Sequence, residues 1–176
     1  GLAGKHLSRR APVLFASHSG MWIECLTRFV EEDLARLAER GLEVVELETK
    51  RVCRLPLGEG IELEVRGRLD RIARSTDECL VGDYKTSKEF ARGASVTEML
   101  RGRALQVPLY SFMEDRAGVE LLQVRSAPRF LEQETVREMR FDGFPAGTEA
   151  GFTETLRVLA QLARAGLYLL RPSEQC

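Results

Sequence analysis

Apolar residues recur every three or four positions in the first third of the chain, which is the spacing of one helix face. These positions are Met21, Trp22, Cys25, Leu26, Phe29, Val30, Leu34, Leu37 and Ala38. Ser19 is placed to cap the start of such a helix, and Gly41 suits its end. The sequence therefore predicts a helix from Met21 to Ala38, preceded by an irregular leader over residues 1–18.

Beyond residue 42 the apolar positions follow the alternation that is typical of β-strands. The clearest case is the segment 61–70, where Leu, Ile and Val alternate with charged residues and Asp70 falls on the polar side. A Val- and Leu-rich segment precedes it over residues 43–57, and a short apolar segment follows over 79–83. The polar residues 74–78 read as a turn. Together these segments predict a three-stranded antiparallel meander.

The second half of the chain predicts two more strands between two helical regions. The first helical region runs from about residue 96 to 115 with a break, and Pro108 must lie in a first helical turn or at a kink. Strands are expected over 119–125 and 135–141, and an amphipathic helix over 152–165. We expect one α/β domain over residues 1–176, with a mixed β-sheet flanked by helices, as a fragment of a larger protein.

Composition narrows the class of protein. The chain has 176 residues, of which 44% are hydrophobic and 30% charged, so a packed core is expected. No apolar stretch approaches the ~18–20 residues of a membrane span, and no signal-peptide pattern opens the chain, which favours a cytoplasmic protein without a membrane partner. The net charge of −1 argues mildly against DNA binding, which usually needs a basic excess.

Three charged residues are candidates for chemistry. Asp83 and Lys85 are two positions apart on one strand, so both side chains point to one face. A hairpin would bring Asp70 beside them. Two carboxylates suit Mg²⁺ or Mn²⁺, and a nearby ammonium can stabilise charge on a phosphate during hydrolysis. The alternative is a solvated Asp83–Lys85 ion pair of little energetic value.

Three motifs extend this interpretation to a family. Gly67-Arg68-Leu69-Asp70-Arg71, then Asp83-Tyr84-Lys85-Thr86, then Gln106-Val107-Pro108-Leu109-Tyr110 stand in this order. The set resembles the RecB-like branch of the PD-(D/E)XK nuclease superfamily, with its G-x-x-D-R, D-Y-K-T and Q-x-x-x-Y motifs. The resemblance implies a restriction-endonuclease-like core in which Asp70, Asp83 and the Tyr84 carbonyl bind the metal and Lys85 is catalytic.

The resemblance also implies contacts with DNA and a further acidic residue. Gln106 and Tyr110 lie one helical turn apart and are expected to contact DNA near the site, and Arg71 is assigned the same role. Ordinary core packing is the alternative for Tyr110. Glu46 and Glu48 are both candidates for the acidic residue of the preceding strand, although either could simply be a surface residue.

Two features depart from the family pattern. Its members usually carry a metal-binding histidine on an early helix, whereas the only histidines here are His6 and His18, and His18 is expected in the loop before Ser19. The run ending in Cys176 resembles the approach to a [4Fe–4S] cluster, which needs four thiolates. Cys25, Cys53, Cys79 and Cys176 form no such set, so we expect a cluster only in a longer parent.

The resemblance implies a Mg²⁺-dependent deoxyribonuclease that works beside a helicase in bacterial double-strand break repair and recombination, on nucleoid DNA. The alternative is a catalytically silent nuclease fold that binds DNA or a partner subunit. Intact Asp70, Asp83 and Lys85 favour the enzyme, whereas the absent histidine and the low net charge favour the silent module.

Overall fold

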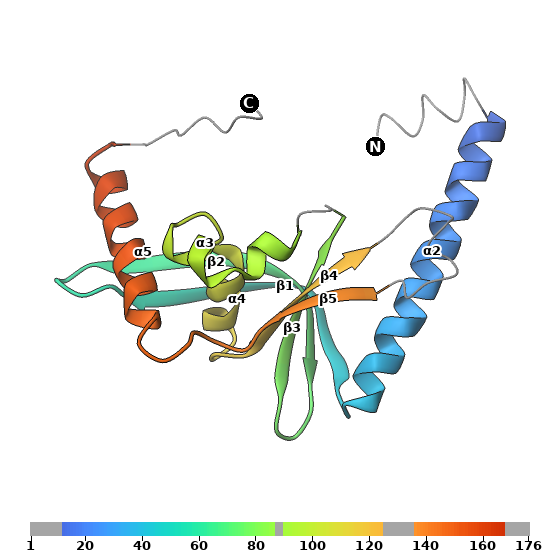
Figure 1. Cartoon of the computed structure of the whole chain (residues 1–176), viewed down its shortest axis with the longest axis horizontal. Helices are drawn as coiled ribbons and strands as arrows, with labels where there is room; N and C mark the ends of the chain where they lie inside the picture. The colour runs from blue at the N-terminus through green and yellow to red at the C-terminus, as the bar shows by residue number, and fades with distance from the viewer. Residues whose placement is uncertain (1–11, 87–89, 125–135, 168–176) are drawn as a thin grey trace.

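The computed structural model describes residues 12–86, 90–124 and 136–167 and shows one five-stranded sheet with helices on both faces (Figure 1). The strand order is β1-β2-β3-β4-β5, in which β3 and β4 are parallel and the other neighbours are antiparallel. In chain order the elements are α2 (Pro12–Glu39), β1 (Glu43–Pro56), β2 (Glu62–Arg74), β3 (Cys79–Lys85), η1 (Phe90–Ala94), α3 (Val96–Leu100), α4 (Gln106–Met113), β4 (Gly118–Val124), β5 (Val136–Phe141) and α5 (Glu149–Arg164). The predicted mixed sheet and its opening meander are confirmed.

Helix α2 begins earlier than the sequence predicted. Residues 12–18 are helical, so they are not an irregular leader, and Ser19 is not a cap. The reason is local: Pro12 suits the first turn, and residues 13–19 contain no glycine or proline that would stop a helix. His18 therefore lies on an exposed helical position beside Trp22 and not in a loop. Residues 1–11 fall outside the described part of the chain.

The region predicted as one broken helix over residues 96–115 forms separate short elements, α3 and α4, with η1 before them. Ser95 caps α3 by accepting a hydrogen bond from the Glu98 amide, and Gly102 adopts a positive φ of 70° just after the helix. Pro108 is the third residue of α4, in the first turn as predicted.

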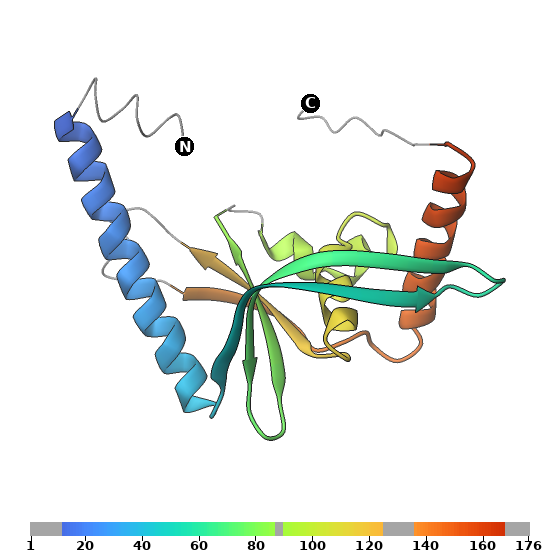
Figure 2. The same ribbon diagram turned by 180° about the vertical axis from the view of Figure 1, so that it is seen from behind.

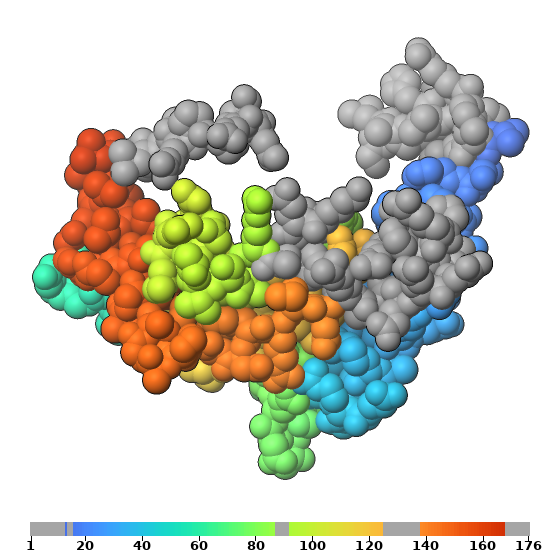
Figure 3. All heavy atoms as spheres, in the orientation of Figure 1, coloured from blue at the N-terminus to red at the C-terminus, as the bar shows by residue number. Residues whose placement is uncertain are grey.

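Strands β1 and β2 form a long twisted ribbon that extends past the rest of the sheet to α5 (Figure 2). At its far end Glu59 pairs with Arg157 of α5 at 2.9 Å. At the C-terminal end of β2, the turn that leads to β3 projects from the molecule (Figure 3). The charged residues of β2 up to Arg68 face outward, whereas Leu69 is fully buried, as the alternation predicted.

The core has two parts, one on each side of the sheet. The larger cluster lies between the sheet and helices α3, α4 and α5, and the smaller one packs α2 against the sheet through Leu37, Leu42, Ala73 and Leu80. Strand β3 lies between them, so its residues from Leu80 to Asp83 are buried on both faces. A charged residue on this strand is therefore removed from water.

Candidate active site

Strands β2 and β3 bring Asp70 to the segment that carries Asp83. Arg71 of β2 lies opposite Gly82 of β3, so the next residues in each strand, Asp70 and Asp83, meet at the end of the paired region. The Asp70 carboxylate accepts a hydrogen bond at Oδ2 from the Tyr84 amide at 3.0 Å. The meander thus provides the convergence that the sequence predicted.

Asp83 and Lys85 point to the same face of β3, toward α4. Lys85 Nζ lies 2.6 Å from Asp83 Oδ2 and donates a 2.8 Å hydrogen bond to Gln106 Oε1. Asp83 is only 3% exposed. Burial raises the pKa of its carboxyl, Lys85 opposes this, and the nearby Asp70 adds to it. A solvated surface pair does not describe this arrangement, because the carboxylate is out of water.

Helix α4 contributes Gln106 and Tyr110 to the same place. Gln106 Nε2 donates to Asp83 Oδ1 at 3.2 Å and to the Tyr110 hydroxyl at 2.8 Å, and that hydroxyl donates to the Arg68 carbonyl at 3.0 Å. The ring of Tyr110 packs against the larger core, as the alternative interpretation expected, while its hydroxyl reaches the polar residues; the DNA contact stays a prediction. Burial raises the pKa of Tyr110. We call Asp70, Asp83, Lys85, Gln106 and Tyr110 the front-face cluster.

The front-face cluster has the donor chemistry of a divalent-cation site. Asp70 and Asp83 offer hard carboxylate oxygens, and Mg²⁺ typically takes one or two carboxylates and keeps water as its other ligands. Asp83 Oδ2 is buried and lies 2.6 Å from the Lys85 ammonium, so a divalent ion bound there would compete with Lys85 for this oxygen. Within the described ranges no group of three or more His, Cys, Asp or Glu residues gathers for a metal. The site residues therefore fit an ion held by few protein ligands.

The two candidate acidic residues of β1 are engaged elsewhere. Glu46 accepts hydrogen bonds from Arg51 at 2.6 Å and from Thr49 at 2.9 Å, and the bond from Arg51 lowers the pKa of Glu46. Glu48 pairs with Arg68 at 2.7 Å. Leu47 pairs with Arg71 and Thr49 with Leu69, so the backbone of Glu48 falls level with Asp70, and its φ of +52° is unusual for a residue with a side chain. Of the two, Glu48 is the nearer to the cluster.

Arg71 does not lie where a DNA contact requires it. Its side chain is 1% exposed and points to the opposite face of the sheet, toward α2. There it donates hydrogen bonds to the carboxylates of Asp33 and Glu120. A guanidinium that is buried and held by two carboxylates cannot reach a DNA phosphate, so the structure gives no support to the assigned contact.

Sequence reasoning missed Asp33 and Glu120. Asp33 takes a core position of α2, between Phe29 and Leu37, and Glu120 interrupts the apolar run of β4. A charge at an otherwise apolar core position needs a buried partner, so both residues carried a signal. The sequence could not say that the partner was Arg71.

The other predicted ligands are scattered or lie outside the described residues. Cys25, Cys53 and Cys79 are free thiols on three different elements. His6 and Cys176 fall outside the described part of the chain. The iron–sulfur cluster of a longer parent therefore stays a prediction.

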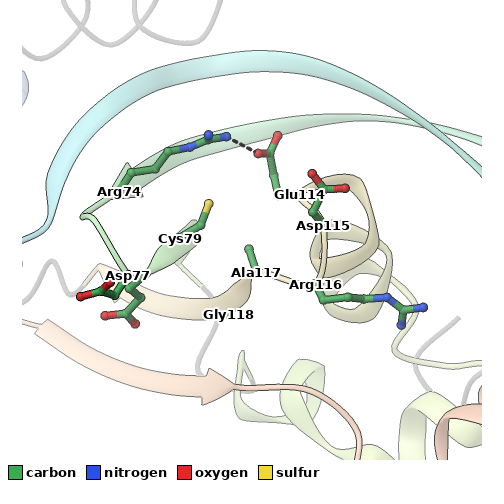
Figure 4. Close-up of a pocket in the computed structure, with 9 residues that line it drawn as sticks. Arg74, Asp77, Cys79, Glu114, Asp115, Arg116, Ala117 and Gly118 are labelled. Atoms are coloured by element: carbon green, nitrogen blue, oxygen red, sulfur yellow. Dashed lines mark hydrogen bonds and ion pairs between the residues drawn. The ribbon is translucent and has the colours of Figure 1, made fainter.

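A charged pocket lies at the opposite end of β3 from the front-face cluster (Figure 4). Arg74, Cys79, Glu114 and Arg116 are among the residues that line it, and none of the front-face cluster does. Arg74 donates to Glu114 at 2.7 Å across the pocket. Burial raises the pKa of the Cys79 thiol. This pocket contributes nothing to the convergence at Asp70 and Asp83.

The described helices include none with the length and apolar character to cross a bilayer. No curated protein matches the chain. The solved structure "Crystal structure of SSO0001" is similar with a TM-score of 0.42 and 14% identity, over 76% of this chain and 56% of that one. The chain thus spans little more than half of that structure's length. The family profile of the PD-(D/E)XK nuclease superfamily matches residues 2–176. The chain therefore belongs to the PD-(D/E)XK nuclease superfamily.

Proposed function

We propose that this chain is a Mg²⁺- or Mn²⁺-dependent deoxyribonuclease domain that hydrolyses DNA phosphodiester bonds at the front-face cluster. The observation that carries the proposal is that side chains from β2, β3 and α4 meet in one network around two carboxylates and one ammonium. Membership of a nuclease superfamily gives that arrangement its chemical meaning.

Each residue of the site has a distinct role in this proposal. Asp70, Asp83 and the Tyr84 carbonyl hold the ion. When bound, the ion supplies charge that neutralises the scissile phosphate and lowers the pKa of an attacking water. The Lys85 ammonium, whose side chain is 29% exposed, faces the reacting phosphate or water and stabilises the developing negative charge.

Gln106 orients the reactive groups in the proposed site. Its amide accepts from Lys85 and donates to Asp83, so it holds the ammonium and the carboxylate in one relative position. Tyr110 anchors Gln106 through its hydroxyl, beside the site where DNA would bind. The two residues thus link the DNA-facing helix to the catalytic strand.

We further propose that the domain acts in double-strand break repair and recombination, beside a helicase and on nucleoid DNA in the bacterial cytoplasm. The order and spacing of the RecB-like motifs support this context. The net charge of −1 argues mildly against DNA binding by this domain alone, an objection that weakens if another domain or subunit supplies most of the phosphate contacts.

A second candidate function is a silent nuclease fold that binds DNA or a partner subunit. One observation favours it: His18 lies on α2 with its ring 6.3 Å from that of Trp22, and among the described residues it makes no contact with the front-face cluster. A site without the histidine has fewer ligands for its ion. Intact Asp70, Asp83 and Lys85 make this the weaker alternative.

Cleavage of end-labelled single- and double-stranded DNA in Mg²⁺ or Mn²⁺ tests the proposal. Asp83→Ala and Lys85→Ala should each lower the rate by at least about 100-fold, since one removes a metal ligand and the other removes transition-state charge stabilisation. Asp77→Ala, in the turn between β2 and β3, and Lys50→Ala, on β1, change exposed residues and are the matched controls; both should cleave normally.

Two results would contradict nuclease activity at the front-face cluster. Normal cleavage by Lys85→Ala would place the nuclease site elsewhere. An inactive wild-type protein that still binds Mn²⁺ and DNA would make the silent module the better account.

A further inference from the structure

Four charged side chains lie behind β3, on the face opposite the front-face cluster, three of them buried and the fourth, Arg36, 20% exposed. They are Asp33 and Arg36 of α2, Arg71 of β2 and Glu120 of β4, which we call the back-face cluster. Arg71 donates to both carboxylates, and Arg36 donates to Asp33 at 2.7 Å and to Glu120 at 2.7 and 2.8 Å. Arg36 also donates to Glu138 at 2.6 Å and Arg40 lies 3.8 Å from Glu120, so the cluster continues toward the surface with its charges balanced.

Arg71 lies directly beneath the segment that carries the front-face carboxylates. It follows Asp70 in β2 and pairs in register with Gly82, which precedes Asp83 in β3. A Cβ atom on Gly82 would lie 2.8 Å from both Nε and Nη2 of Arg71. The guanidinium therefore rests against the Gly82 backbone, and only glycine leaves room for it.

Tyr84 connects the two faces of β3. On the back face its ring lies 5.7 Å from the Arg71 guanidinium and meets the Phe29 ring edge-to-face at 5.7 Å. On the front face its amide donates to Asp70 Oδ2. The ring thus anchors the residue whose amide orients Asp70 and whose carbonyl is the proposed third ligand.

Stability alone does not account for this cluster. Burying four ionised side chains carries a desolvation cost that their mutual attraction often only offsets, and apolar residues of similar size are commonly as stabilising. The Arg71 Nε is itself buried without a hydrogen-bond partner among the described residues. Apolar side chains could hold α2 to the sheet, but they could not fix Gly82 and Tyr84 by a planar fork clamped between two carboxylates.

We propose that Arg71 is a positioning residue for the metal site. Clamped by Asp33 and Glu120, it holds the backbone of residues 82–84 against β2, so that Asp70 and Asp83 are already in place when a divalent ion arrives. The proposal rests on the proposed function, because it assumes that these two carboxylates bind the ion.

Mn²⁺ affinity, measured without DNA by electron paramagnetic resonance of the free ion, tests this role. Arg71→Met should weaken Mn²⁺ binding by about 10- to 100-fold, the effect expected when the support of a ligand is lost. Arg71→Lys keeps the charge but not the fork and should give a smaller loss. The triple variant Asp33→Asn, Arg71→Met, Glu120→Gln leaves no unpaired carboxylate, so it remains testable if Arg71→Met does not fold.

Leu37→Ala is the matched control. It truncates a side chain that is 1% exposed in the same α2–sheet interface, without touching the back-face cluster. It should lower the melting temperature and leave Mn²⁺ affinity within about twofold of wild type. A purely structural role for Arg71 predicts that both variants lose stability and neither loses affinity.

Faster hydrogen exchange of the Tyr84 amide in the triple variant, with core amides of β4 unchanged, would support the proposed route from Arg71 to Asp70. Wild-type Mn²⁺ affinity in the folded triple variant would overturn the positioning role and leave the metal site standing. If the wild-type protein bound no Mn²⁺, the metal site of the proposed function would itself be wrong, and the positioning role with it.

Discussion

The two faces of strand β3 both carry charge, but they carry it differently. On the back face two arginines meet two carboxylates, all largely buried. On the front face two carboxylates, Asp70 and Asp83, meet one ammonium, Lys85, which is partly open to solvent. The back face is neutral and reaches solvent only at its edge, through Arg36 and its partner Glu138, whereas the front face has an excess negative charge beside the partly exposed Lys85. Both faces bury charged groups. The face that can bind a cation is the one with an excess of negative charge that solvent can reach.

The largest expected effect is on stability and concerns the back face. Arg71→Ala should lower the free energy of unfolding by about 3–5 kcal/mol, because it leaves two buried carboxylates with one arginine between them. Urea denaturation followed by circular dichroism measures it. A loss below about 1 kcal/mol would mean that the back face is not closed to water.

Gly82→Ala tests how closely the Arg71 guanidinium approaches strand β3. The new Cβ would meet the Arg71 guanidinium at 2.8 Å, so we expect a loss of about 1–3 kcal/mol in unfolding free energy. Gly20→Ala in α2 is the matched control, because nothing lies within 4 Å of its new Cβ and alanine favours a helix. The control should gain about 0.5–1 kcal/mol. Equal losses in both variants would contradict the close approach of Arg71.

Tyr110→Phe tests the hydroxyl that ties α4 to β2. The variant loses one hydrogen bond to the Arg68 carbonyl and one from Gln106. We expect a loss of about 0.5–1.5 kcal/mol in unfolding free energy. Cleavage should slow more than this stability loss explains, since Gln106 loses its anchor. Unchanged cleavage at every substrate concentration would show that the Tyr110 hydroxyl has no role in the site.

The smallest expected effect has the opposite sign and concerns the front face. Burial raises the pKa of Asp83, which means that its charged form is less favourable in the folded than in the unfolded chain. Asp83→Asn in metal-free buffer should therefore keep or raise the unfolding free energy, by up to about 1 kcal/mol, while cleavage is lost. If calorimetry showed that Asp83→Asn clearly destabilises the protein, the front-face charges would stabilise the fold, as those of the back face do.

The sequence predicted the front face better than the back face, for a physical reason. Asp70, Asp83 and Lys85 lie on neighbouring strands of one hairpin, so alternation and a turn were enough to bring them together. Helical spacing put Gln106 and Tyr110 on one face of a helix, and the resemblance to the family placed that face at the site. The back face joins Asp33, Arg71 and Glu120, whose pairing depends on how α2 crosses the sheet and on the parallel placement of β4. No local period encodes either arrangement.

The difference between local patterns and long-range contacts also explains the errors in the predicted fold. The strands were predicted nearly to their ends, because alternation and turn residues mark them. The early start of α2 was missed because residues 12–18 show no apolar period, and only the absence of helix breakers indicated a helix there. Arg71 was misassigned because an arginine beside a catalytic aspartate looks the same in the sequence whether it faces DNA or the core.

The parallel pairing of β3 with β4 has a consequence for the order of events during synthesis. Arg71 and Glu120 are 49 residues apart, and everything from η1 to α4 must be made between them. A nascent chain that has left the ribosome only as far as Lys85 already contains both carboxylates and the lysine, but its arginine has just one of its two anchors. The growing chain therefore presents its reactive residues before it can hold them in place, and only the arrival of β4 completes the fold around them.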